Sequence, residues 1–399
     1  MLVPVILTDN RPTGDVAPIA RRGHILPHMP LHDSPAVSAA RDLAPIIAGR
    51  DTADAETYPA QNVADLYEAG VIRAPFTADL GGSGATLADA VRITEVVATA
   101  SPSTALIIAM PLGLAGAYAC GHEVVPPEHR ASWLAQVDHA AGEFRDGRIY
   151  AACNSEKGAG GSVKDIKTLA TDADGRYSLS GQKILASSGR FATYFFSTAK
   201  LDAGTDRERV EVFVVRSDAP GVDVLSDWDG FGMRSTESHS VGYTNAIADH
   251  MLGWPNFIDH SQSFFYWFCL FAAIPLGCAR SMLDALSTPA PQSPALRLRL
   301  SEAQMRYESL AAYLQETASM WRPGVDKAYA MRVIRTKTYV TQESTRLCAE
   351  LFALSGGRHY TRTGRLARLL ADSFAGTALR PPLPLALDML VTQFGDSDA

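Results

Sequence analysis

The stretch of residues 151–201 constrains the fold of this chain more than any other. Its centre, residues 154–168, reads NSEKGAGGSVKDIKT, and its glycines are too closely spaced for a stable helix. Residues 177–189 read YSLSGQKILASSG, where apolar and small polar side chains alternate as they do on half-buried strands. The sequence therefore predicts a β-module with an exposed loop whose backbone N–H groups can hold phosphate or carbonyl oxygens.

On both sides of this stretch the apolar residues recur at helical spacing. Helices are expected before it over residues 34–50, 60–70, 87–100, 103–120 and 126–140, and after it over residues 261–286, 296–319, 324–354 and 365–375. Strands are expected only between about residues 149 and 250, because only there does the pattern shorten and alternate between turn signals.

These patterns divide the chain into four parts. The first 30 residues contain five prolines and no sustained period, so they are interpreted as an arm. The predicted parts are an N-terminal arm (1–30), an N-terminal helical domain (31–148), a central β domain (149–253) and a C-terminal helical bundle (254–399).

Composition and charge exclude several classes of function. The net charge is −7 and the basic residues are scattered, which argues against a nucleic-acid partner. The five cysteines have neither zinc spacing nor the density of a secreted disulfide scaffold, so we expect no metal site and a cytoplasmic protein. The apolar start of the chain is too short for a signal peptide. Residues 264–278 are fewer than the roughly 20 that span a bilayer, and Pro275 interrupts them, so a buried helix is expected.

Three blocks of the central stretch resemble the flavin-binding signature of the acyl-CoA dehydrogenase family. Residues 155–162 (SEKGAGGS) are similar to Thr-Glu-Pro-x-Ala-Gly-Ser-Asp, residues 166–168 (IKT) to Ile-x-Thr, and residues 181–189 (GQKILASSG) to Gly-x-Lys-x-x-Ile-Thr-Asn. The spacing is kept without gaps. Further similar segments extend the resemblance over about residues 34–382.

The resemblance implies a fold and a cofactor. The fold is mainly α with a central β-barrel module between an N-terminal helical domain and a C-terminal helical bundle. The cofactor is FAD, with FMN as the alternative, held between the β-module and the C-terminal helices. The implied cofactor-binding residues are Ala152, Asn154, Ser155, Gly160, Gly161, Ser162, Leu185, Ser187, Gly356 and Gly357, and the implied substrate-binding residues are Ser162, Arg234 and Trp267.

The residue that should act as the catalytic base departs from the family. An acyl-CoA dehydrogenase removes the α-proton of a thioester with a Glu carboxylate while the flavin accepts the β-hydride. Counted from the flanking motifs, one family position of this Glu falls on Arg380, or on Ala375 if a gap intervenes, and the other falls on Trp267. None of these is a carboxylate. The candidates that remain for a catalytic role are Glu156, Asp372 and Arg380.

A second departure concerns the cofactor's phosphates. The family's Arg-x-x-Phe-Gly segment, which helps to hold the flavin pyrophosphate, is replaced here by the proline-rich residues 287–294. A phosphate contact would then come from elsewhere, and Arg297, Arg299 and Arg358 are candidates. The alternative for each is an ordinary solvated arginine.

Three functions therefore remain open. The first is a FAD-dependent oxidoreductase that dehydrogenates an acyl thioester without the usual Glu. The second is a monooxygenase on the same fold that uses reduced flavin and oxygen and needs no α-proton base. The third is a catalytically silent binding or assembly subunit. The expected partners are an acyl-CoA-like or aromatic small molecule, an electron-transfer protein or flavin reductase, and further copies of the chain in a homodimer or homotetramer, but neither nucleic acid nor a membrane.

Overall fold

Five helices form the N-terminal part of the described chain, which comprises residues 33–395 of a computed structural model. They are α1 (Pro35–Ala53), α2 (Ala60–Glu68), α3 (Leu87–Ala100), α4 (Pro102–Gly121) and α5 (Arg130–Arg145). The α4 helix begins where Ser101 accepts a hydrogen bond from Thr104 N, and all its residues from Pro102 to Tyr118 are buried. It is therefore the central helix of this part. The predicted arm, residues 1–30, lies outside the described residues.

The strands lie between residues 150 and 251, as the sequence predicts for the described part of the chain. They are β1 (Tyr150–Cys153), β2 (Leu169–Ala173), β3 (Arg176–Ala186), β4 (Tyr194–Leu201), β5 (Arg209–Arg216), β6 (Val222–Val224), β7 (His239–Ile247) and β8 (His250–Met251). Together they form one sheet in the order β6-β7-β3-β2-β4-β5-β8, with β1 parallel to β4. The two end strands do not pair with each other, so the sheet is open, and the expected closure into a barrel is wrong. Both end strands are very short, which leaves little backbone for such a closure.

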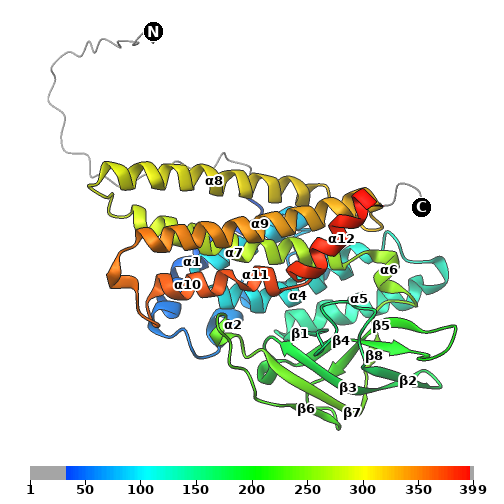
Figure 1. The fold of residues 1–399 in the computed structure, drawn as a ribbon. Helices are drawn as coiled ribbons and strands as arrows, with labels where there is room; N and C mark the ends of the chain where they lie inside the picture. Colours follow the sequence, from blue (N-terminus) through cyan, green and yellow to red (C-terminus); the bar gives the residue numbers. More distant parts are fainter. Residues whose placement is uncertain (1–32, 396–399) are drawn as a thin grey trace. The chain divides into compact units, whose positions relative to one another are not determined.

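The C-terminal part is again helical (Figure 1). Its elements are α6 (Phe257–Ser261), α7 (Phe264–Ser287), α8 (Pro294–Ser319), α9 (Lys327–Leu354), α10 (Arg365–Ser373), α11 (Ala375–Ala378) and α12 (Leu383–Gly395). The α7 helix packs against α3 at Gly277, where an added Cβ would lie 2.5 Å from the Cβ of Ala98. The sequence analysis did not predict α12, which begins directly after two prolines.

Two helices of the described chain, α4 and α7, are long and apolar enough to cross a membrane by length and composition alone. Most of each helix is nevertheless buried inside the protein, 89% of the apolar window in α4 and 78% in α7. Both pack in the main apolar core, as the sequence analysis expects for residues 264–278.

Candidate functional site

The glycine-rich loop after β1 has one open edge and one sealed edge. Gly158, Gly160 and Gly161 have φ angles of 85°, 56° and 85°, which L side chains rarely adopt. A Cβ added at Gly158 or Gly160 would meet nothing within 4 Å. A Cβ at Gly161 would lie 2.4 Å from Cδ of Pro382, in the segment between α11 and α12. The loop can thus receive a ligand beside the first two glycines, while the C-terminal segment covers the third.

Glu156 anchors this loop from inside. One carboxylate oxygen accepts hydrogen bonds from Lys183 Nζ at 2.6 Å and Thr168 N at 3.1 Å, and the other accepts one from Lys167 N at 2.6 Å. The side chains of Glu156 and Lys183 are 4% and 0% exposed. Burial alone raises the pKa of Glu156, but these donors lower it overall. With its oxygens occupied and shielded from solvent, Glu156 holds the loop and is not free to accept a substrate proton in this structure.

The other predicted cofactor residues of the β-module form the rim of the loop. Asn154 Oδ1 accepts a hydrogen bond from Thr198 N at 2.9 Å, and Ser155 pairs with Ile184 in an isolated β-bridge. Ala152 lies opposite Phe196 in the β1–β4 pairing. Ser162 N donates to the carbonyl of Ala159 at 2.8 Å and closes the loop. The register of the sheet therefore fixes where the loop begins and ends.

Leu185 and Ser187 lie in the third predicted block. Leu185 has a φ of 61° and its side chain is 51% exposed, which is an unusual conformation for a bulky residue. Such a strained and exposed apolar side chain is typical of a ligand-binding position. Ser187 is buried, and its hydroxyl lies 2.9 Å from that of Ser238. The third block thus exposes the apolar side chain of Leu185, while the hydroxyl of Ser187 bonds to the buried hydroxyl of Ser238.

A cavity of about 220 Å³ lies beside this block. Its lining includes Asp51, Asn62 and Ser235, together with Tyr58. Tyr58 donates a hydrogen bond from its hydroxyl to Ser188 Oγ at 3.0 Å, and its ring is stacked on Phe191. The cavity therefore borders the turn that follows Leu185 and Ser187. The sequence analysis treated Tyr58 only as part of a helix break and did not find this cavity.

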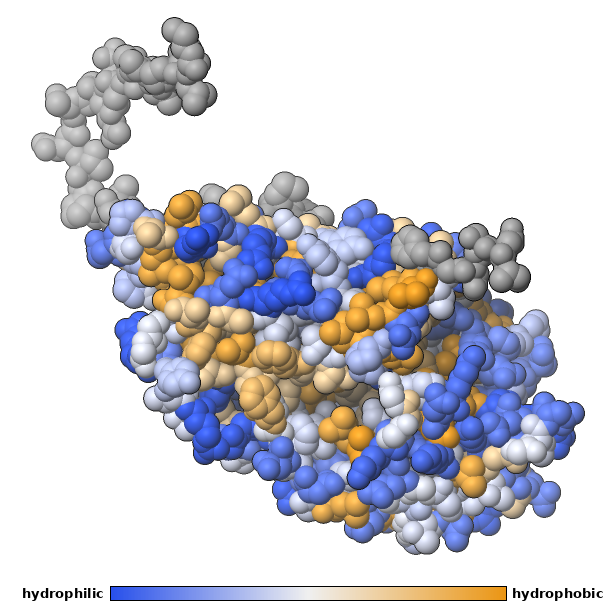
Figure 2. Space-filling model, viewed as in Figure 1, coloured by the Kyte–Doolittle hydropathy of each residue, from blue (hydrophilic) through white to orange (hydrophobic). Residues whose placement is uncertain are grey.

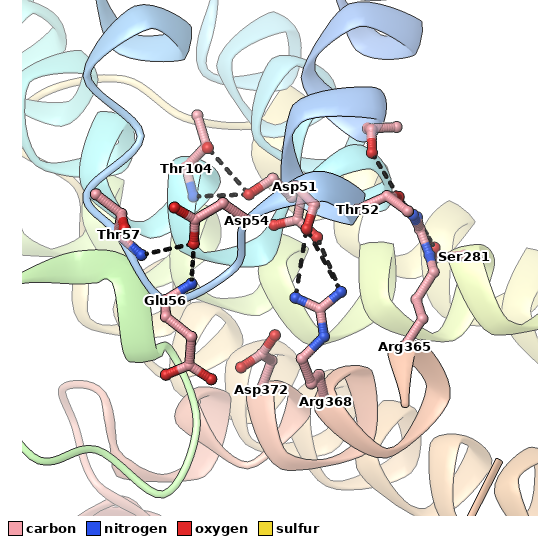
Figure 3. Close-up of polar contacts among 12 residues, drawn as sticks. Asp51, Thr52, Asp54, Glu56, Thr57, Thr104, Ser281, Arg365, Arg368 and Asp372 are labelled. Atoms are coloured by element: carbon pink, nitrogen blue, oxygen red, sulfur yellow. Dashed lines mark hydrogen bonds and ion pairs between the residues drawn. The ribbon is translucent and has the colours of Figure 1, made fainter. Parts of the chain in front are cut away.

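A network of charged residues joins Asp51, in the lining of the cavity, to α10 (Figure 3). Arg368 on α10 approaches Asp51, with 3.6 Å between Nη2 and Oδ2. Asp372, one turn further along α10, accepts a hydrogen bond from Met233 N at 2.6 Å. Burial raises the pKa of Asp372 to about 7 despite that bond. Asp372 thus ties the segment before β7 to α10, and this bond gives it a structural role.

Arg234 lies at the edge of the same region. Its Nη2 is 2.6 Å from Glu56 Oε2, so it joins the segment before β7 to the loop between α1 and α2. Both side chains are partly exposed, at 31% for Arg234 and 51% for Glu56. The pair is accessible to a ligand that approaches the cavity, which keeps a substrate-binding role for Arg234 a prediction.

Trp267 is part of the core between α4 and α7. Its Nε1 donates to the carbonyl of Met110 at 3.2 Å, and a Cβ added at Gly113 would lie 2.2 Å from that nitrogen. The residue is 6% exposed. The indole therefore occupies the space that Gly113 leaves open, and the expectation that Trp267 contacts substrate is not supported by its packing. Ala375 lies on α11, where the next residue, Gly376, packs against Pro275.

Arg380 reaches the glycine-rich loop from the C-terminal segment. Its Nη2 donates to the carbonyl of Asn154 at 2.6 Å, while its Nε and Nη1 are buried and have no hydrogen-bond partner among the described residues. Lys337, a buried residue of α9, donates from Nζ to the carbonyls of Leu379 at 2.8 Å and Pro381 at 2.7 Å. Lys337 thereby fixes the backbone on both sides of Arg380. No signal in the sequence distinguishes Lys337 from an exposed lysine.

The remaining residues predicted to contact the cofactor or its phosphates bond only to near neighbours in the sequence, or follow a helix without a described contact to the loop. Gly356 and Gly357 follow α9, and no described contact joins them to the glycine-rich loop. The three arginines considered for a phosphate contact make short-range bonds: Arg297 to the carbonyls of Pro291 and Gln292, Arg299 to Glu302, and Arg358 to His359. None of these bonds is made to the loop. Arg380 is the arginine that the structure directs at it.

Taken together, these residues fit a flavin better than a metal ion. The open glycine edge, the exposed Leu185 and the unpaired donors of Arg380 offer a surface for a flat, anionic ligand. Within residues 33–395, by contrast, no group of three His, Cys, Asp or Glu side chains could hold a metal ion.

Comparisons with known proteins agree with this geometry. Family models of the acyl-CoA dehydrogenase N-terminal domain and middle domain match residues 30–138 and 151–246. The chain is 23% identical over 345 residues to benzylmalonyl-CoA dehydrogenase of Aromatoleum aromaticum, covering 83% of this chain and 88% of that enzyme. It is 33% identical over 220 residues to L-evernosamine nitrososynthase of Micromonospora, covering 52% and 50% of the two chains.

A solved structure shares the fold. The crystal structure of KijD3 in complex with FMN and dTDP-3-amino-2,3,6-trideoxy-4-keto-3-methyl-D-glucose superposes with a TM-score of 0.77 at 23% identity, over 92% of this chain and 94% of that one. Two family domains matched in order, the helix–sheet–helix architecture and the three signature blocks lead to one conclusion: the chain belongs to the acyl-CoA dehydrogenase family.

Proposed function

We propose that this protein is a flavin-dependent monooxygenase, which oxidises a polar small molecule with reduced flavin and oxygen. The observation that carries the proposal is that neither family position for the catalytic base holds a carboxylate in this sequence. Of the two family positions for the base, one is filled by the buried Trp267 and the other by Ala375 or Arg380. A positioned base contributes roughly 10²–10⁴-fold to proton abstraction, so its loss disfavours α,β-dehydrogenation.

The two carboxyl groups nearest to these positions have other bonds. Glu156 accepts three hydrogen bonds from the loop and Lys183, and Asp372 accepts one from Met233 N. Freeing Glu156 would disrupt the glycine-rich loop, and freeing Asp372 would break a bond between the β-module and the C-terminal helices. A monooxygenase needs no such base, because the bound flavin supplies the electrons and activates the oxygen. The protein's own residues then bind, orient and shield the reactants.

The cavity beside Tyr58 can take a small molecule that carries both polar and apolar groups. Its lining is more apolar than polar, and its polar groups come from Tyr58, Asn62, Ser235 and Asp51. The similarity to the enzyme named L-evernosamine nitrososynthase supports an oxidation of this kind, with a nitrogen-bearing substrate. In this proposal Tyr58 aligns the substrate through the Ser188 turn, and Leu185 covers the cofactor.

Two measurements test this function. We expect the purified protein to bind oxidised FAD or FMN with a change in its visible spectrum, and to consume oxygen when a flavin reductase and an amine substrate series are supplied. Anaerobic mixing of the flavin-loaded protein with acyl-CoAs of increasing chain length should leave the flavin oxidised. Bleaching within seconds by any acyl-CoA would instead establish dehydrogenation, and the absence of any flavin binding would favour the catalytically silent alternative.

We also propose that the protein is a cytoplasmic homo-oligomer that receives reduced flavin from a reductase. The five cysteines are all free thiols in the structure, in keeping with a reducing compartment. The α12 helix exposes Leu387 and Val391, and Figure 2 shows an apolar surface over this helix. A second copy of the chain is the partner that we assign to this surface, and light scattering that finds only a 42.8 kDa species would contradict it.

A further inference from the structure

The guanidinium of Arg380 is far from satisfied in the protein alone. A guanidinium carries five N–H donors and stays charged, yet the structure shows one hydrogen bond, from Nη2 to the carbonyl of Asn154. The Nε and Nη1 groups are buried without a partner. Burying charged donors without acceptors is costly, so a residue retained in this state normally has a ligand that completes its bonds.

The surroundings of Arg380 are short of negative charge. The basic side chains that meet here are Arg380, Lys183 and Lys337, and Glu156 is the carboxylate that faces them. Burial lowers the pKa of Lys337 to about 7, so Arg380 is the lasting unpaired charge. Glu156 is already bound to Lys183. Neither Arg380 nor Lys337 forms an ion pair among the described residues, since their bonds go to backbone carbonyls. The region would therefore gain stability from one added anion.

The position of these donors beside the glycine-rich loop is rigidly fixed. Lys337 holds the carbonyls of Leu379 and Pro381 on either side of Arg380, and the ring of Pro382 packs on Gly161. The open edge at Gly158 and Gly160 begins next to that contact. Backbone N–H groups of this edge and the guanidinium that reaches the same loop at Asn154 are the two kinds of donor that an oxyanion binds.

We propose that Arg380 and the open edge of the glycine-rich loop form an anion-binding site, in which Nε and Nη1 of Arg380 bind an anionic oxygen. The inference rests on the proposed function only in naming flavin phosphate as one source of that oxygen. The other source is a free oxyanion such as inorganic phosphate or an acidic substrate. In either case the alignment without a gap puts this positive charge at a family position of the base, whereas the alignment with a gap puts Ala375 there.

Binding measurements without turnover test this site. The probes are FMN, riboflavin, which lacks the phosphate, and inorganic phosphate, each titrated into the full-length protein by calorimetry. The variants are Arg380→Met and Arg380→Lys, with Arg299→Met as a matched control on an exposed arginine. We expect Arg380→Met to weaken the binding of the anionic probe about 10- to 100-fold, which is the range for losing charge-assisted hydrogen bonds. Arg380→Lys should weaken this binding less.

The three probes separate the sources of the anion. If Arg380→Met loses affinity for FMN but not for riboflavin, the site binds the flavin phosphate. If it loses affinity for inorganic phosphate alone, the site binds a free oxyanion. Unchanged affinities of Arg380→Met for all three probes would overturn the proposal. If no flavin binds but phosphate does, the proposed monooxygenase function fails while the anion site stands.

Thermal unfolding gives a second readout that does not depend on flavin chemistry. Without added anion, Arg380→Met should melt at or above the temperature of the wild type, because it removes unpaired buried donors. Added phosphate or FMN should then raise the melting temperature of the wild type more than that of the variant. A variant that melts well below the wild type without ligand and responds equally to it would show that Arg380 is only a structural contact.

Discussion

Replacing Lys183 by Met should destabilise the β-module strongly, because it leaves the Glu156 carboxylate charged and buried without its cation. The two side chains are 0% and 4% exposed, and 2.6 Å separates Nζ from Oε1. Removing one partner of a buried pair costs roughly 3–5 kcal/mol. The two backbone donors, Lys167 N and Thr168 N, remain and place the expected loss at the lower end of that range.

Urea unfolding at pH 7 measures this loss, with Lys200→Met as a control because Lys200 pairs with Glu208 in a more exposed setting. Adding Glu156→Gln to Lys183→Met should recover part of the stability, since the double variant buries no unpaired charge. The pKa of Glu156 lies below its unfolded value of 4.5, so its stabilising contribution is present above that pH and is lost as the pH falls through the folded pKa. Without Lys183 the Glu156 carboxyl should protonate at a higher pH. The difference in unfolding free energy between Lys183→Met and the wild type should therefore shrink in acid. A loss below about 1 kcal/mol would refute the reasoning.

Two further predictions concern packing and pH. Gly113→Ala should destabilise the chain by about 1–3 kcal/mol in urea because its Cβ would meet the Trp267 indole, whereas Gly49→Ala, with open space at its Cβ, should be neutral or stabilising; equal effects would contradict the packing. Asp372→Asn should gain stability relative to the wild type as the pH rises from about 4 to 8, with exposed Asp42→Asn as the control. The folded pKa of about 7 lies above the unfolded 3.8, so the stability from the protonated carboxyl is fully present below pH 3.8 and is lost as the pH rises from there through 7. A melting-temperature difference that does not change with pH would exclude this titration.

The architecture was predictable from the sequence because local patterns determine it. Alternation between polar and apolar residues over residues 177–189 placed β3 within a few residues of its observed bounds, and a 3.6-residue period did the same for α8. Closure of the sheet could not be predicted in this way. It depends on whether the end strands meet in space, and strands as short as β6 and β8 carry almost no sequence signal.

The site was predictable only where a single segment forms it. The glycine-rich loop and the Ser187 turn were found from their spacing, whereas the anchoring of the loop joins residues far apart in the chain. The bond from Arg380 to Asn154 spans 226 residues, and that from Asp372 to Met233 spans 139. A single sequence does not show which distant groups meet. It therefore left Glu156 and Asp372 as candidate bases, and only the structure shows which donors occupy them.

The charge at the site follows from these distant contacts more than from any one motif. Glu156 keeps its family-like place in the loop but is neutralised by Lys183, so it contributes no free negative charge. Arg380 brings a guanidinium to the carbonyl of Asn154 at the glycine-rich loop, and Lys337 holds the backbone on both sides of it. If Arg380 occupies the family position of the base, as one of the two alignments implies, a cation replaces a carboxylate there. A guanidinium does not accept a proton, but it can bind an anion, so the proposed oxidation and the proposed anion site follow from the same substitution.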